Sequence, residues 1–195
     1  MCDKSPKVTR QHSIAGTRLL LGCAGWPQPS WDHGYFPEDL PPDWRFAYYR
    51  NEADCLLMAA DQWVVLAPAE REDWLDQLPE GFRFYVELNG DESPHELDLA
   101  ALGDHLGALL VPAGSRATGL PDVPLWTPCG DGAWGAQDGE PRLLRWTLDS
   151  DDLRVWRQRV EELPSGVQAL VFDGASANPR QLWEIRQLLQ LLGLA

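Results

Sequence analysis

The chain has 195 residues, which is enough for one domain with a sizeable hydrophobic core. Its 16 basic and 30 acidic residues give a formal net charge of −14, which favours solubility and excludes the dense phosphate contacts of nucleic-acid-binding proteins. No apolar run approaches the roughly 18 residues that a membrane-spanning helix needs. We therefore expect neither a nucleic-acid partner nor a membrane partner.

The four cysteines form no Cys-x-x-Cys pair, so the sequence contains no zinc-ribbon or redox motif. They are Cys2, Cys23, Cys55 and Cys129. The first residues also lack the apolar segment of a secretory signal peptide. Together these features predict a cytoplasmic protein with free thiols.

Residues 1–16 are polar and aperiodic, which predicts a mobile tail, and residues 17–195 are expected to form a single α/β domain. The first elements expected after the tail are a strand over 17–22, an aromatic loop to residue 42, a helix over 44–50, a strand over 54–60, a helix over 69–78 and a strand over 82–88. These strands are short apolar runs, typical of a sheet that is covered on both faces.

The second half of the chain continues this alternation. Ser93, Pro94 and Glu96 form the pattern of a helix start, and this helix is expected to end near Gly103. Residues 113–141 are rich in glycine, proline and aspartate and are predicted to be mostly loop. The other expected elements are strands over 107–111, 142–148 and 167–173, a helix that begins at Ser150, and a last helix that begins at Asn178-Pro179.

Strands that alternate with helices indicate a mainly parallel sheet. The sequence yields about six strands, whereas a closed eight-stranded barrel typically occupies about 250 residues. The fold class that we predict is therefore α/β, a shortened or partly open TIM-type barrel.

An aromatic, proline-rich segment follows the first strand and is the most distinctive stretch of the chain. Trp26, Trp31 and Tyr35 lie in it, and we predict that they form an aromatic wall for a ligand, with Asp32 and His33 as polar partners. In that case Trp31 should be partly exposed, whereas Trp26, next to Gly25, should be packed. The alternative is that the rings close the barrel mouth as part of the core.

Acidic and imidazole side chains follow several of the predicted strands. Sites in parallel α/β folds lie at the carboxyl ends of the strands, where these groups could bind a divalent metal or act as acid and base. The four candidates are Asp61, Glu87, His95 and Asp173. The alternative is that they are solvated residues of a very acidic protein.

Several motifs together resemble the YecE-like family, also called domain of unknown function 72. They are Gly22-Cys-Ala-Gly25-Trp26 with Trp31 and Tyr35-Phe36-Pro37, Pro79-Glu-Gly-Phe-Arg-Phe-Tyr-Val86, Leu102-Gly-Asp-His-Leu-Gly-Ala-Leu-Leu-Val111 and Val171-Phe-Asp-Gly. The resemblance covers residues 17–112 and 142–192. The resemblance implies a TIM-type barrel, but it implies no activity, because none is established for the family.

The chain also departs from that family. Leu57 and Ala59 stand where the family carries Glu and Asn, and Glu87 stands where it carries Lys. The resemblance therefore implies a shortened, diverged member that has lost most of its polar site. We predict a non-catalytic module that binds a small ligand or a protein and needs no cofactor. The alternative is a metal-assisted hydrolase or isomerase that uses the four strand-end residues and a divalent metal.

Overall fold

The computed structural model describes residues 18–90, 93–117, 119–120, 122–147, 150, 152–174, 177 and 179–193. The tail predicted over residues 1–16, Cys2 and the start of the last helix at Asn178 lie outside these residues. Within the described ranges, no helix combines the length and the apolar composition that crossing a bilayer requires.

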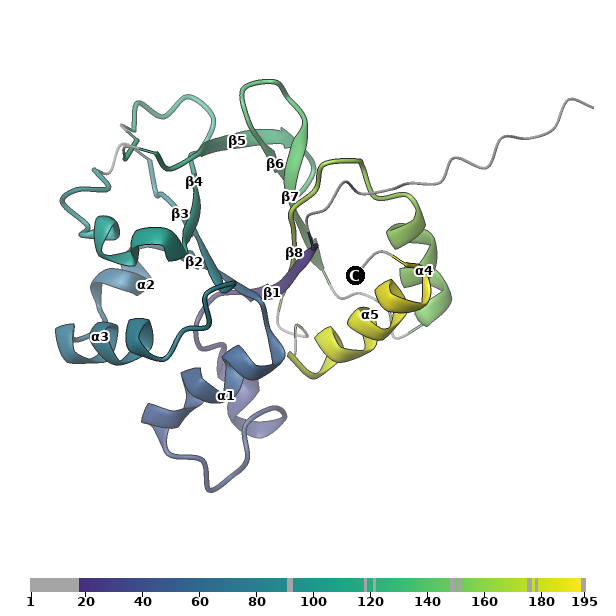
Figure 1. The fold of residues 1–195 in the computed structure, drawn as a ribbon, viewed down its shortest axis with the longest axis horizontal. Coiled ribbons are helices and arrows are strands. Elements are labelled where there is room, and N and C mark those ends of the chain that lie inside the picture. The colour runs from purple at the N-terminus through teal and green to yellow at the C-terminus, as the bar shows by residue number, and fades with distance from the viewer. Residues whose placement is uncertain are drawn as a thin grey trace, which may run out of the picture.

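Eight strands form a closed barrel in chain order, with the last strand paired to the first (Figure 1). The strands are β1 (Leu20–Ala24), β2 (Cys55–Ala59), β3 (Arg83–Glu87), β4 (Leu106–Leu110), β5 (Leu125–Gly130), β6 (Ala133–Gly135), β7 (Pro141–Thr147) and β8 (Ala169–Asp173). All neighbouring pairs are parallel except the two that involve β6. The predicted TIM-type barrel is thus confirmed, and its sheet is closed rather than partly open.

The segment over residues 113–141 is not mostly loop, as predicted, because it contains β5 and β6. β6 runs antiparallel to both of its neighbours, so β5, β6 and β7 form a meander without intervening helices. The prediction failed because the glycine, proline and aspartate residues of this segment mask the pairing signal. Trp126 and Trp134 nevertheless point into the barrel and are buried.

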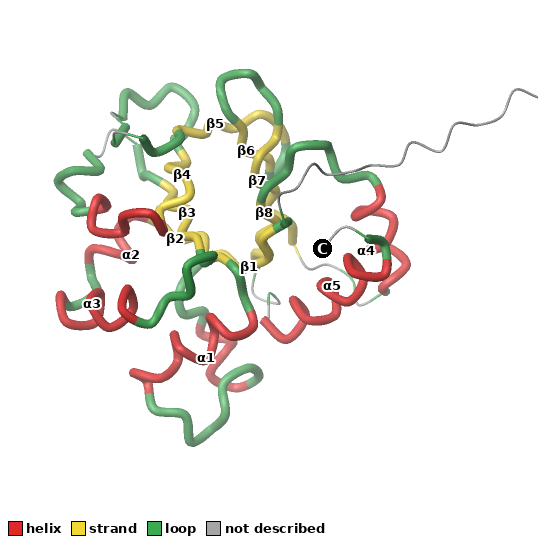
Figure 2. Tube along the Cα trace, viewed as in Figure 1, coloured by secondary structure: helices red, strands yellow, loops and turns green. Residues whose placement is uncertain are grey.

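Helices cover the barrel beside β1–β3 and β8, whereas loops alone cover the described side of β5 and β6 (Figure 2). The helices are α1 (Arg45–Glu52), α2 (Ala60–Val64), α3 (Pro68–Asp76), α4 (Leu153–Glu161) and α5 (Pro179–Leu191). The helix predicted over 93–103 is wrong: a 3₁₀ helix spans Leu99–His105 instead. Asp98, directly before it, has a left-handed φ of 54°, which interrupts any longer α-helix.

Alternation along the strands divides the core into two layers. In β8, Ala169 and Val171 face the barrel interior, whereas Leu170 and Phe172 face the surrounding helices. The interior layer consists of Ala24, Cys55, Leu57, Tyr85, Ala108, Leu110, Trp126, Trp134, Leu143, Ala169 and Val171. The barrel is therefore filled by side chains and is not a pore.

Gly22 of β1 is required for close packing inside this barrel. A Cβ atom at this position would collide with the backbone carbonyl of Cys55 and lie 2.7 Å from its Sγ atom. We predict that Gly22→Ala lowers the free energy of unfolding by about 1–3 kcal/mol or more, as overpacking does. Gly81→Ala is the control, because nothing lies within 4 Å of its Cβ position. Urea denaturation of both variants tests this prediction, and equal stabilities would contradict it.

Candidate functional site at the barrel mouth

The carboxyl ends of the parallel strands meet at one end of the barrel and form a small cavity of about 160 Å³. We call this end the mouth. It is lined by Ala24, Gly25, Gln28, Leu57, Met58, Ala59, Gln62, Glu87, Arg145 and Asp173. Apolar and charged groups therefore meet where parallel α/β folds carry their sites.

A three-residue ion-pair network spans the mouth. Arg145 of β7 donates from Nε to Oδ2 of Asp173 at 2.8 Å and from a terminal nitrogen to Oε2 of Glu87 at 3.0 Å. The side chains of Arg145, Glu87 and Asp173 are 32%, 30% and 33% exposed, so water still reaches all three. The guanidinium thus bridges the two carboxylates and leaves one net negative charge at the mouth.

Two of the four predicted strand-end residues contribute to this network. Glu87 and Asp173 are the last residues of β3 and β8, and the closed sheet brings both to the mouth. Asp61 is exposed on α2, and His95 lines a separate cavity of about 420 Å³. No group of three or more His, Cys, Asp or Glu side chains that could hold a metal occurs among the described residues.

The prediction that these four side chains form one cluster is therefore wrong. A strand fixes the direction of its own last residue, but Asp61 and His95 lie beyond their strand ends, where the chain has already turned away. Arg145 is not among the predicted site residues. It lies two residues after Leu143 on β7, and Leu143 faces the barrel interior, so the alternation of this strand could have revealed it.

The aromatic residues of the loop after β1 do not form a ligand-binding wall. Trp31 and Tyr35 are 0% and 1% exposed, and Trp31 donates from Nε1 to the carbonyl of Ala177 at 2.7 Å. The expected partial exposure of Trp31 is therefore wrong. Both rings belong to the outer core layer, as does the half-buried ring of Trp26. This corresponds to the alternative in which the rings are core.

The polar residues predicted in the same loop lie apart from the mouth lining. Asp32 is exposed and pairs with Arg45 at 2.9 Å, and the side chain of His33 lies outside the described structure. The loop instead reaches the mouth through Gly25 and Gln28, and the Gln28 side chain donates to the carbonyl of Ala24 at 2.6 Å. Its contribution to the site is thus one amide side chain and the backbone around it.

Gln62 of α2 attaches this loop to β2. Its side chain accepts from the Ala59 amide at 3.0 Å and donates to the Trp26 carbonyl at 3.2 Å. These two hydrogen bonds fix the rim of the mouth between β1 and β2. Neither Gln28 nor Gln62 is among the predicted site residues.

The buried thiols are poor candidates for a nucleophile. Burial raises the pKa of Cys23, and the charge of Asp173 raises it further. Burial also raises the pKa of Cys55, and the negative charge of Asp54 raises this pKa further. Because the thiolate is the reactive form, neither side chain is set up for nucleophilic chemistry.

Comparisons with known proteins agree with this architecture. The sequence profile of the family described as protein of unknown function DUF72 matches residues 20–111, which run from β1 through β4. Over this stretch, the chain is similar to the DUF72 family. No curated protein matches the chain.

The fold also matches the crystal structure of a DUF72 family protein, TM1631, from Thermotoga maritima. The TM-score is 0.56 at 12% sequence identity, and the match covers 90% of this chain and 99% of the other. At this identity the likeness supports the barrel alone. The function of this protein therefore has to be argued from its own side chains.

The burial of Trp31 leads to a prediction about stability. We expect Trp31→Ala to lower the free energy of unfolding by about 3–5 kcal/mol, because the truncation leaves a cavity in the outer core and the Ala177 carbonyl unpaired. Trp183→Ala on α5 is the matched control. That side chain is 57% exposed, and its loss should change stability by no more than about 0.5 kcal/mol. Chemical denaturation distinguishes the two, and a small effect at Trp31 would contradict its role in the core.

The position of His95 leads to a prediction about metal binding. Because His95 lines a different cavity from Glu87 and Asp173, His95→Ala should leave calorimetric titration with Mn²⁺ unchanged. Loss of a ligand would instead weaken metal affinity by about tenfold or more. One-to-one binding in the wild-type protein that His95→Ala abolishes would favour the metal-assisted alternative.

Proposed function

We propose that this protein is a non-catalytic binding protein whose mouth takes a small molecule with both a cationic and an anionic group. The observation that carries the proposal is the Arg145 bridge between Glu87 and Asp173. This bridge places one hydrogen-bond donor group, the guanidinium, and two acceptor groups, the carboxylates, at a single small cavity. All three groups remain partly exposed. The proposal requires no cofactor.

A ligand with charges of both signs can exchange with these ion pairs without leaving a charge unpaired. Its ammonium group would take the place of the guanidinium at one carboxylate, and its carboxylate would pair with the freed face of Arg145. A bidentate pair between a guanidinium and a carboxylate is among the strongest hydrogen-bonded pairs in proteins. A ligand with one charge only would leave a partner unsatisfied, which costs binding free energy.

The size of the mouth favours a small ligand over a protein partner. The cavity of about 160 Å³ is well below the range of about 300–1,000 Å³ that drug-sized ligands occupy. Ala24 and Leu57, which both face the barrel interior, supply an apolar side against which a short aliphatic group can pack. A ligand of the small amino-acid class meets these requirements of size, charge and polarity.

The composition of the mouth favours binding over catalysis. Its described lining contains no serine, cysteine, histidine or lysine, so Glu87 and Asp173 are its only candidates for a nucleophile or a proton-transfer group. Each carboxylate is already paired with Arg145, whose positive charge opposes the approach of a divalent cation. The hydrolase or isomerase alternative needs four ligating residues, and only two of them lie here.

A calorimetric panel tests the proposal. We expect alanine to bind the wild-type protein at one-to-one stoichiometry and to bind more tightly than propionate or ethylamine, which each lack one charge. Arg145→Gln should weaken the binding of alanine by about tenfold or more, because it removes a charged hydrogen-bond partner.

Arg142→Gln is the matched control for this panel. Arg142 lies on the same strand but pairs with Asp138 outside the mouth, so its loss should leave alanine binding unchanged. Circular dichroism of both variants checks that the fold is intact. Failure of all three probes to bind, or equal binding by the two variants, would contradict the proposal.

A further inference from the structure

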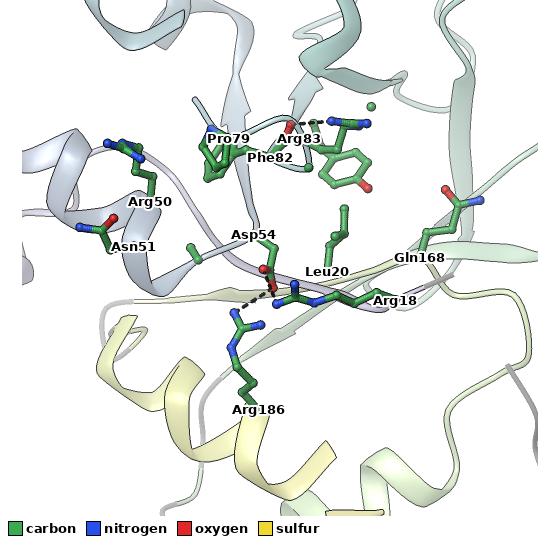
Figure 3. Close-up of a pocket in the computed structure, with 14 residues that line it drawn as sticks. Arg18, Leu20, Arg50, Asn51, Asp54, Pro79, Phe82, Arg83, Gln168 and Arg186 are labelled. Atoms are coloured by element: carbon green, nitrogen blue, oxygen red, sulfur yellow. Dashed lines mark hydrogen bonds and ion pairs between the residues drawn. The ribbon is translucent and has the colours of Figure 1, made fainter. Parts of the chain in front are cut away.

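A second, larger cavity lies at the opposite end of the barrel, where the strands begin. It has a volume of about 780 Å³, and residues before β1, at the end of α1, at the start of β3 and on α5 line it (Figure 3). We call it the base cavity. Its charged lining consists of four arginines and one aspartate, namely Arg18, Arg50, Arg83, Arg186 and Asp54. Three positive charges are therefore uncompensated in a chain whose formal net charge is −14.

The single carboxylate of the base cavity is fully engaged. Asp54 accepts from Arg18 through Oδ1 at 2.9 Å and from Arg186 through Oδ2 at 2.8 Å (Figure 3). Its Oδ2 atom also accepts from the Leu21 amide at 3.1 Å. Arg186 donates in addition to the Glu52 carbonyl at 3.2 Å. Asp54 thus ties α5 to the start of the barrel and cannot neutralise the remaining arginines.

Arg50 and Arg83 have no carboxylate partner within the described part of the chain. One terminal nitrogen of Arg83 donates to the carbonyls of Glu80 and Phe82, at 2.7 and 2.9 Å. Arg50 is half-buried, and its Nε atom is buried without a hydrogen-bond partner among the described residues. A buried donor of a charged group that lacks an acceptor is costly, and neighbouring guanidinium groups add to that cost by repulsion. An anion in the cavity offsets the excess positive charge of its lining.

We propose that the base cavity binds a small organic anion that carries phosphate or carboxylate groups, with Arg50 and Arg83 as its main partners. Planar guanidinium groups match both kinds of oxyanion through paired hydrogen bonds. Asn51 and Gln168, which also line the cavity, can donate hydrogen bonds without adding charge. This site is separate from the mouth, and the proposal does not depend on the function proposed there.

The dimensions of the base cavity indicate a compact ligand. Its volume falls within the range of about 300–1,000 Å³ that is typical of sites for small organic molecules. A nucleic-acid chain would extend beyond the cavity and meet the negative surface of the protein. A small anion within it is screened from remote charges, because the Debye length is about 8 Å at physiological ionic strength.

Calorimetry at physiological ionic strength tests this proposal, with pyrophosphate and citrate as separate probes on the full chain. We expect saturable one-to-one binding of at least one probe, and the preferred probe identifies the ligand as phosphate-bearing or carboxylate-bearing. Arg50→Gln should weaken that binding by about tenfold or more, because it removes the guanidinium that lacks a partner. At equal concentration, the same probe should raise the midpoint of thermal unfolding of the wild-type protein by more than that of Arg50→Gln.

Two control variants make the result specific. Arg157→Gln removes the same charge from an exposed arginine of α4 that pairs with Glu161, and it should leave the affinity unchanged. Arg145→Gln alters the mouth and should also leave binding at the base cavity unchanged. Failure of both probes to bind the wild-type protein would overturn the proposal. Equal losses of affinity in Arg50→Gln and Arg157→Gln would overturn it as well, because they would reflect net charge alone.

Discussion

The reversed strand β6 is the constraint on which the rest of the structure depends. Two parallel neighbours need a crossover of about a dozen residues or more, whereas antiparallel neighbours need only a tight turn. Placing β6 between β5 and β7 closes the sheet with short connections and returns β7 to the common strand direction. The carboxyl end of β7 therefore reaches the mouth, and Arg145 arrives between Glu87 and Asp173.

The aromatic loop after β1 stabilises the side of the barrel that β1 and β2 form. It does so through packing rather than through ligand contact. The centroid of the Trp26 ring lies 5.3 Å from the ring centroids of both Tyr49 and Trp74. The Tyr49 hydroxyl accepts a hydrogen bond from the Cys23 amide and donates one to the Cys55 carbonyl. This hydroxyl thus joins β1 to β2 from outside the barrel. Because the loop also positions the mouth rim through the Trp26 carbonyl, its packing and the geometry of the mouth are coupled.

Much of the fold follows from local sequence, because each buried parallel strand is a short apolar run and needs no knowledge of its partners. The residues of β6 carry no such signal, since its pairing depends on strands that only the closed barrel brings beside it. The residues of the candidate site also differ in whether local sequence predicts their position. Glu87 and Asp173 end their strands and could be predicted, whereas the burial of Trp31 depends on the distant Ala177 carbonyl. Loops usually lie at the surface, which is why that burial was not expected.

Strand β3 connects the two ends of the barrel and explains why they can differ in charge. Arg83, Tyr85 and Glu87 alternate on its inner face, so one strand places a cation at the base cavity and an anion at the mouth. Between the two cavities, the Tyr85 ring stacks on the Trp126 ring, with a centroid distance of 5.5 Å, within an interior layer filled by side chains. Because this layer is packed, neither water nor a ligand passes from one cavity to the other. The barrel therefore carries two separate cavities whose linings have opposite net charge.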